Sequence, residues 1–70
     1  MITEIGIVAG DIWHQLDRVD RMTLDELVRN TGKSRDLVLM GLGWLAREGH
    51  VVIGGEDIRS CVASLNKKSR

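Results

Sequence analysis

Apolar positions in the first part of the chain recur with the period of a helix. From Ile5 to Val19 they stand three and four residues apart, which places them along one side of a helix. We expect Thr3 to cap the start of this helix, because a threonine hydroxyl accepts a hydrogen bond from a free amide of the first turn. Met22 follows the helix and indicates a short extended link to the next element.

A short second helix is predicted by signals at both of its ends. Thr23 and Glu26 have the spacing of a capping box, in which the two residues satisfy each other's free backbone amides. The predicted helix covers residues 24–30, and Gly32 supplies the left-handed residue that ends it.

The third helix is predicted to run from Ser34, its N-terminal cap, to Glu48, with Gly49 as the residue that stops it. Three of its apolar residues share one face, because they recur at helical spacing. We expect this face to pack against the first two helices and to consist of Val38, Leu42 and Leu45.

The C-terminal segment changes from a helical period to an extended one. Residues 51–53 form one predicted strand and residues 58–62 the other, with a glycine-containing turn between them. Pairing Ile53 with Ile58 puts Gly55 first in a two-residue turn, a position that favours glycine. The fold class is therefore mostly α with a small antiparallel β-hairpin, in the order of a winged helix-turn-helix with three helices and a wing.

The length of 70 residues is enough for one domain. We assign that domain to residues 1–65 and a polar basic tail to residues 66–70. A chain of this size buries only about 60% of the surface that its unfolded form exposes, so small domains often gain stability by association. Cys61 is the one cysteine in the sequence, so no disulfide within the chain contributes.

Two parts of the sequence resemble proteins of the winged-helix superfamily. The third helix and the start of the wing have the spacing of many winged-helix regulators at Ser34, Val38, Leu42, Leu45, Gly49 and Val51. The first half of a helix-turn-helix is matched by Leu24, Leu27 and Val28 with the turn Thr31-Gly32-Lys33. More narrowly, the chain resembles a family of small stand-alone winged-helix proteins of unassigned function, at MITEIGIVAGDIWHQL and MGLGWLAREGHV. This resemblance implies the fold and brings no substrate, ligand or catalytic residue.

The third helix is apolar on nearly all sides, and such a helix is expected to be buried on nearly all sides. One small domain covers only one side of it, so we expect a second protein chain to cover the flank that carries Trp44. On the first helix, Gly6 and Gly10 leave a smooth strip beside Trp13, and Trp13 itself fits the core of the monomer as well as an interface. The candidate interface residues are Leu37, Met40, Gly41, Trp44, Gly6, Gly10 and Trp13.

Direct binding of duplex DNA is the alternative function, which the fold favours and the expected surface disfavours. Base edges are contacted by Arg, Lys, Asn or Gln, with further cations on the phosphates. Here ten basic and ten acidic residues cancel, and the wing tip carries Glu56 and Asp57, which phosphates repel. A dimer that gathers basic residues across two chains would supply a patch. The candidate nucleic-acid contacts are Lys33, Ser34, Arg35, Arg47 and Arg59.

The remaining chemical groups point to no reaction. His14 and His50 lack the spacing of zinc motifs, and we expect them to be solvated or locally bonded. Cys61 is expected to be a small buried hydrophobe, although a reactive thiol or a link between chains stays open. We expect no catalysis, no cofactor and no bound metal. A start without signal-peptide features, no membrane-spanning apolar run and a lone thiol together indicate the cytoplasm.

These observations favour a non-catalytic module that acts by protein–protein interaction, as a homodimer or with another protein, in a transcription-regulatory context. The alternative is a direct duplex-DNA-binding transcriptional regulator. A sensor of a small molecule or a metal is a more remote third hypothesis.

Overall fold

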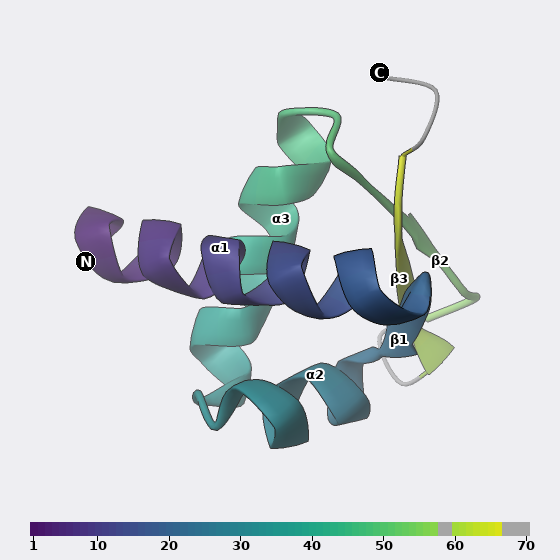
Figure 1. The fold of residues 1–70 in the computed structure, drawn as a ribbon, viewed down its shortest axis with the longest axis horizontal. Coiled ribbons are helices and arrows are strands. Elements are labelled where there is room, and N and C mark those ends of the chain that lie inside the picture. Colours follow the sequence, from purple (N-terminus) through teal and green to yellow (C-terminus); the bar gives the residue numbers. More distant parts are fainter. Residues whose placement is uncertain (58–59, 67–70) are drawn as a thin grey trace.

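The computed structural model describes residues 1–57 and 60–66, and within them it contains three helices and a three-stranded sheet (Figure 1). The elements follow in the order of a winged helix-turn-helix, so the predicted fold class is confirmed. In this arrangement α2 and α3 form the helix-turn-helix, while β2 and β3 form the wing. The elements are α1 (Ile2–Val19), β1 (Arg21–Thr23), α2 (Leu24–Thr31), α3 (Arg35–Arg47), β2 (Val51–Gly54) and β3 (Val62–Leu65).

One hydrophobic core lies between the three helices and the inner face of the sheet. Figure 1 shows α1 crossing α3, with α2 below them and the strands at one end. The predicted core face of α3 is confirmed, because Val38, Leu42 and Leu45 are buried. The helical core residues are Val8, Ala9, Ile12, Leu16, Leu24, Leu27, Val38, Leu42 and Leu45, and the sheet side adds Met22, Val51, Cys61 and Ala63.

The helix-turn-helix has the end signals that the sequence predicts. Thr23 Oγ1 accepts a hydrogen bond from the Glu26 amide at 3.1 Å, and the Glu26 carboxylate accepts one from the Thr23 amide at 2.9 Å. Gly32 ends α2 at a φ of 69°, in the left-handed region. Ser34 Oγ accepts a hydrogen bond from the Leu37 amide at 3.2 Å and caps α3. These local contacts fix where both helices begin.

The predicted cap of the first helix is wrong. α1 begins at Ile2, and Thr3 lies inside it, because the amide of Ile5 already donates to the Met1 carbonyl at 3.0 Å. The position before the helix, Met1, makes no capping hydrogen bond with its side chain. The helix therefore begins before its first buried residue, Val8, and these first turns position the surface described below.

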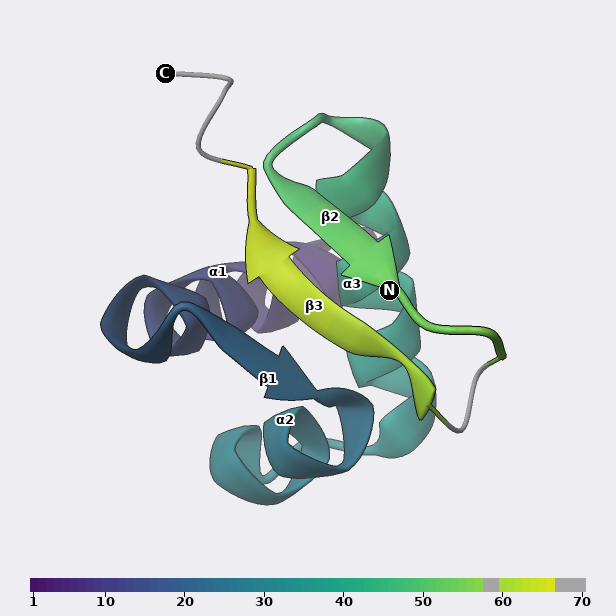
Figure 2. The same ribbon diagram turned by 90° about the vertical axis from the view of Figure 1, so that its right-hand side faces the viewer.

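The sheet has the order β1-β3-β2, so the last strand lies in the middle (Figure 2). The predicted extended link at Met22 is in fact a strand, which pairs antiparallel with β3 and places Met22 opposite Ala63. These two residues face the core and are buried. Their neighbours, Arg21 and Ser64, lie opposite each other on the outer face.

The predicted pairing of the wing strands is also wrong. Ile53 lies opposite Ala63, and the second wing strand is Val62–Leu65 instead of residues 58–62. Ile58 and Arg59 lie outside the described residues. A shift in register changes which side chains face the core, so burial selects the register that places Ala63 there.

A longer loop replaces the expected two-residue turn of the wing. The Ser60 hydroxyl accepts a hydrogen bond from the Glu56 amide at 3.1 Å, and Asp57 Oδ1 accepts one from the Ser60 amide at 3.1 Å. Gly55 has a φ of 114°, and a Cβ atom there would collide with the Ser60 carbonyl oxygen. Glycine is thus required at this position by a close approach within the loop.

Part of the predicted tail belongs to the fold. Asn66 donates from its backbone amide to the His50 carbonyl at 2.9 Å and from Nδ2 to the Gly49 carbonyl at 3.1 Å. These bonds tie the end of β3 to the start of the wing. Residues 67–70, the rest of the predicted tail, lie outside the described residues.

Candidate interaction surface

α1 crosses α3 at Gly41, where the backbones of the two helices come close together. A Cβ atom at this position would lie 3.2 Å from Ile12 Cδ1, 3.3 Å from the Ala9 backbone nitrogen and 3.3 Å from Val8 Cγ1. Gly41 is itself buried, so its predicted place in an interface with a second chain is wrong. The helix that it approaches belongs to its own chain, and α1 therefore covers the middle of the flank that the sequence assigns to a partner.

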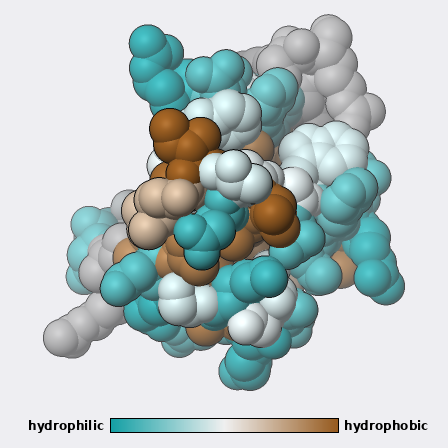
Figure 3. All heavy atoms as spheres, turned by 90° about the vertical axis from the view of Figure 1, so that its left-hand side faces the viewer, coloured by the Kyte–Doolittle hydropathy of each residue, from teal (hydrophilic) through white to brown (hydrophobic). Residues whose placement is uncertain are grey.

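Beyond this crossing, the first turns of α1 and the second half of α3 enclose an apolar hollow of about 200 Å³, lined by Ile2, Ile5, Gly6 and Trp44. Trp44 is 51% exposed at its edge, and Ile2 is 85% exposed. Figure 3 looks at the side of the molecule on which α1 begins and shows apolar side chains gathered in its upper centre among pale and hydrophilic ones. The first turns of α1 thus cover Trp44 only in part.

A smaller hollow of about 90 Å³ lies beside a different part of α1 and is lined by Glu4, Ile7, Val8, Lys33 and Leu37. Ile7 is 56% exposed here. Leu37 is half-buried and packs against the core, so it contributes less to a free surface than the sequence predicts. Charged groups border this second hollow, whereas the side chains around the Trp44 hollow are apolar.

The other predicted interface residues differ in how they are placed. Met40 is 39% exposed on α3. Gly6 and Gly10 are exposed on α1, and a Cβ atom at either would meet no other group within 4 Å. Trp13 is half-buried, and its ring meets that of His14 edge-on with the centroids 5.7 Å apart. The structure thus brings Gly6 and Trp44 together around one hollow.

The sequence prediction missed Ile2 and Ile5, which line this hollow. The signal was available, because Ile2 and Gly6 stand one helical turn apart on the side of α1 that also carries Trp13. The predicted cap at Thr3 placed Ile2 outside the helix. Extending the helical period back by one turn places both isoleucines beside Gly6.

The predicted nucleic-acid contacts that the structure describes do not form one cluster. Arg35 Nη1 donates to Asp25 Oδ1 at 2.8 Å, and the Ser34 hydroxyl serves as the cap of α3. Lys33 and Arg47 are exposed near opposite ends of α3, whose 13 residues separate those ends by about 18 Å. Arg59 lies outside the described residues. The exposed residues of α3 are Arg35, Asp36, Met40, Gly43, Trp44 and Arg47, and those opposite its core face are Asp36, Met40, Gly43 and Arg47.

Two titratable groups have shifted pKa values, and both shifts have a local structural cause. The backbone hydrogen bond from Thr23 lowers the pKa of the Glu26 carboxyl, which is the acidic member of the capping box. Burial raises the pKa of the Cys61 thiol, so the neutral form is favoured. The predicted burial of Cys61 is confirmed, with 5% of the residue exposed. His14 and His50 are both exposed, as expected.

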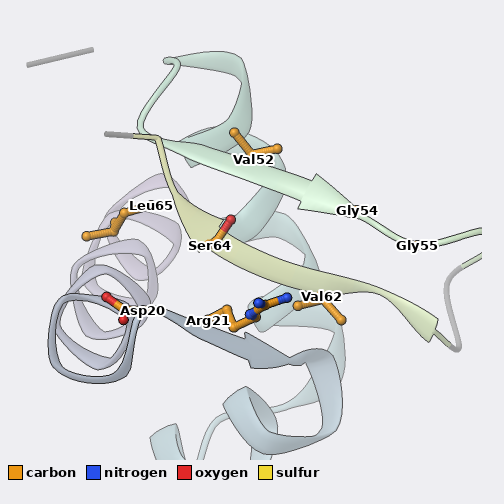
Figure 4. Close-up of a pocket in the computed structure, with 8 residues that line it drawn as sticks. All are labelled: Asp20, Arg21, Val52, Gly54, Gly55, Val62, Ser64 and Leu65. Atoms are coloured by element: carbon orange, nitrogen blue, oxygen red, sulfur yellow. The ribbon is translucent and has the colours of Figure 1, made fainter. Parts of the chain in front are cut away.

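The outer face of the sheet has a broad, shallow hollow of about 570 Å³. Val52, Ser64 and Arg21 form a row across its three strands, and Figure 4 shows the Arg21 side chain extending over the sheet toward Val62. Asp20, at the end of α1, adds a charge of opposite sign to that of Arg21. This hollow mixes apolar, polar and charged side chains, unlike the one at Trp44.

The part of the chain that the structure describes has neither a metal-ligand cluster nor a membrane-spanning helix. None of its His, Cys, Asp and Glu side chains form a group of three or more that could hold a metal ion. None of its helices is both long and apolar enough to cross a membrane.

The fold and this distribution of side chains define a winged helix-turn-helix protein. The model of the winged helix-turn-helix domain family DUF2582 matches residues 1–64, so the chain belongs to that family. The family that the sequence resemblance indicates is thereby confirmed.

Two known proteins are similar to this chain over most of its length. The chain is 32% identical over 56 residues to the uncharacterized protein MJ1608 of Methanocaldococcus jannaschii, a match that covers 77% of this chain and 80% of that protein. It is also similar to the solution NMR structure of protein BT2368 from Bacteroides thetaiotaomicron, with a TM-score of 0.75 and 31% identity over 96% of this chain and 79% of that one. The second match shows that the chain shares its fold with a protein whose structure has been solved.

Proposed function

We propose that the protein is a non-catalytic winged-helix module that acts by protein–protein interaction, with a second copy of the chain as its partner. The observation that carries this proposal is the half-exposed Trp44 at the edge of an apolar hollow on α1 and α3. Protein interfaces are enriched in tryptophan and methionine, and soluble monomers rarely leave such groups together in water. By analogy with its fold, the setting is transcriptional regulation in the cytoplasm.

The shortage of base-contacting side chains on the helix-turn-helix also supports this proposal. A DNA-reading helix needs side chains that reach base edges, and the exposed face of α3 offers a methionine and a glycine between Asp36 and Arg47. Arg35 is engaged by Asp25 in an exposed ion pair. The apolar face of α3 near α1 is thus the better candidate for recognition than the face that winged-helix proteins turn toward DNA.

Association would also stabilise a small domain by mass action, because a partner that binds the folded chain lowers the population of the unfolded one. We therefore expect the thermal midpoint of the wild-type chain to rise by several degrees over roughly a hundredfold increase in protein concentration. Trp44→Ala and Met40→Glu should each flatten this dependence.

Val52→Ala provides a matched control for the tryptophan variant. Val52 is also 51% exposed, but it lies on the outer face of the sheet, away from α1 and α3. The control should keep the concentration dependence of the wild-type chain. The proposed interface would be refuted if the thermal midpoint of the wild-type chain did not change with protein concentration. It would also be refuted if the midpoints of all the variants changed with concentration to the same extent.

A further inference from the structure

We propose that Asp25 is a specificity-determining residue of the helix-turn-helix, which excludes nucleic acid by neutralising Arg35, the first residue of α3. The contact that carries this inference is the ion pair between Arg35 Nη1 and Asp25 Oδ1, at 2.8 Å. It joins the first turn of α2 to the first turn of α3. Neither residue lines the hollow at Trp44. The inference therefore goes beyond the proposed function, and either one can fail without the other.

The pair occupies the place where a helix-turn-helix meets DNA. In such proteins the first residues of the second helix reach base edges, while the first helix crosses the phosphate backbone. An arginine at the start of α3 has the donors to contact a guanine or a phosphate. Asp25 instead supplies an acceptor from within the chain. Both side chains face solvent, because that of Arg35 is 49% exposed and that of Asp25 is 68% exposed.

The two helix ends around this pair are acidic. Glu26 stands beside Asp25 in the first turn of α2, and Asp36 follows Arg35 in the first turn of α3. The amino ends of helices favour anions, and in complexes with DNA they often receive phosphate groups. Here carboxylates of the chain itself lie at both ends. The two first turns thus contain three carboxylates and one guanidinium, an arrangement that repels a phosphate.

Asp25 differs from its acidic neighbour Glu26 in what it contacts. The Glu26 carboxylate accepts a hydrogen bond from the Thr23 amide at 2.9 Å, so it serves the start of α2. Asp25 is bonded to a guanidinium on the other helix, ten residues along the chain. An exposed ion pair contributes little to stability, and buried side chains such as Leu27 and Val38 already hold the helices in one core. The main consequence of the pair is therefore electrostatic.

Replacing the carboxylate is the direct test. Asp25→Asn removes the charge and keeps the size of the side chain. By fluorescence anisotropy it should bind a labelled duplex of random sequence about tenfold more tightly than the wild type at about 50 mM salt, because one more phosphate contact forms. Its log–log salt slope should be steeper by about 0.9. Asp25→Glu keeps the charge and should bind as the wild type does.

Asp17→Asn is the matched control. It makes the same change of net charge at an exposed residue of α1, so it should leave the salt slope unchanged. A second substitution separates the release of Arg35 from the loss of charge alone. Arg35→Ala in the Asp25→Asn chain should abolish the gain in affinity, whereas Arg35→Ala in the wild-type chain should change the affinity little. Circular dichroism checks that each variant is folded.

The outcomes separate this inference from the proposed function. A gain with Asp25→Asn no larger than that with Asp17→Asn would overturn the role of Asp25. So would a gain that survives the loss of Arg35, because the guanidinium would then not be what is released. A wild-type chain whose binding to the duplex already depends on Arg35 would overturn it as well. A monomeric wild-type chain would refute the proposed interface and leave the role of Asp25 as it is.

Discussion

Gly41 and Gly43 lie on two sides of α3, and the structure explains only one of these two glycines. At Gly41, α1 lies so close that even a Cβ atom would approach three of its atoms within 3.3 Å. At Gly43 a Cβ atom would meet nothing. The first glycine is explained inside the chain, and the second is not. The apolar residues of α3 differ in the same way, because α1 covers one part of their flank and leaves Trp44 half-exposed.

The largest expected effect is a difference in stability between leucine variants at these two glycines. Gly41→Leu should lower the free energy of unfolding by about 3 kcal/mol, because the new side chain would have to displace α1. Gly43→Leu should raise it by up to about 1 kcal/mol, since leucine favours a helix more than glycine does. Urea unfolding of both variants measures the difference. Equal effects at the two positions would show that α1 does not cross α3 at Gly41.

A smaller effect on stability is expected at the Thr23–Glu26 capping box, where the helix-turn-helix begins. Thr23→Ala should cost about 1 kcal/mol of stability, because the Glu26 amide loses the hydroxyl that accepts its hydrogen bond. Unlike the changes at Trp44, this loss should not depend on protein concentration. Urea midpoints at a low and a high concentration check both points, and a loss that grows on dilution would link the cap to association.

The same capping box predicts a dependence on pH. The pKa of the Glu26 carboxyl is lower in the folded chain, so its contribution is present above the unfolded pKa and is lost as the pH falls through the folded pKa. The stability difference between wild type and Glu26→Gln should therefore shrink on acidification below the ordinary carboxyl range, near pH 4. Urea midpoints of both proteins across that range measure it. A difference that grows with acid would contradict the sign of the shift.

The smallest effect is expected with DNA. Because Arg35 is paired with Asp25 and the exposed face of α3 is poor in cations, few phosphates would be neutralised. Affinity for random duplex should be weak, with a log–log salt slope shallower than about −4. A salt titration of a labelled duplex measures it. Submicromolar binding at physiological salt with a steeper slope would favour the DNA-binding alternative.

Local signals in the sequence were enough to predict the helix-turn-helix. The Thr23–Glu26 box, the Ser34 cap and the left-handed Gly32 each depend on residues within one turn, and each is present. The wing register was not predictable in this way, because it depends on the pairing of Ala63 with Met22, which lies 41 residues earlier in the sequence. A short turn at Gly55 satisfies the local pattern, but it leaves that distant pairing unmade.

The candidate surface shows the same division between local and distant information. A helical wheel places Trp44 and Gly41 on one flank of α3. It does not show that α1 of the same chain covers Gly41 fully and Trp44 only in part, because that depends on the angle at which the two helices cross. The role of Ile2 was lost for a simpler reason, namely that α1 begins earlier than the expected cap.

Sedimentation equilibrium of the wild-type chain tests the central claim most directly, since the claim is that the exposed side of α1 and α3 at Trp44 meets a second copy. We predict a reversible dimer, with the mass falling to that of one chain on dilution and with Trp44→Ala shifted toward monomer at every concentration. A single-chain mass for the wild type at high micromolar concentration would contradict the account. Trp44 would then be a half-exposed residue of a monomer, and the face of α1 and α3 would bind no second copy.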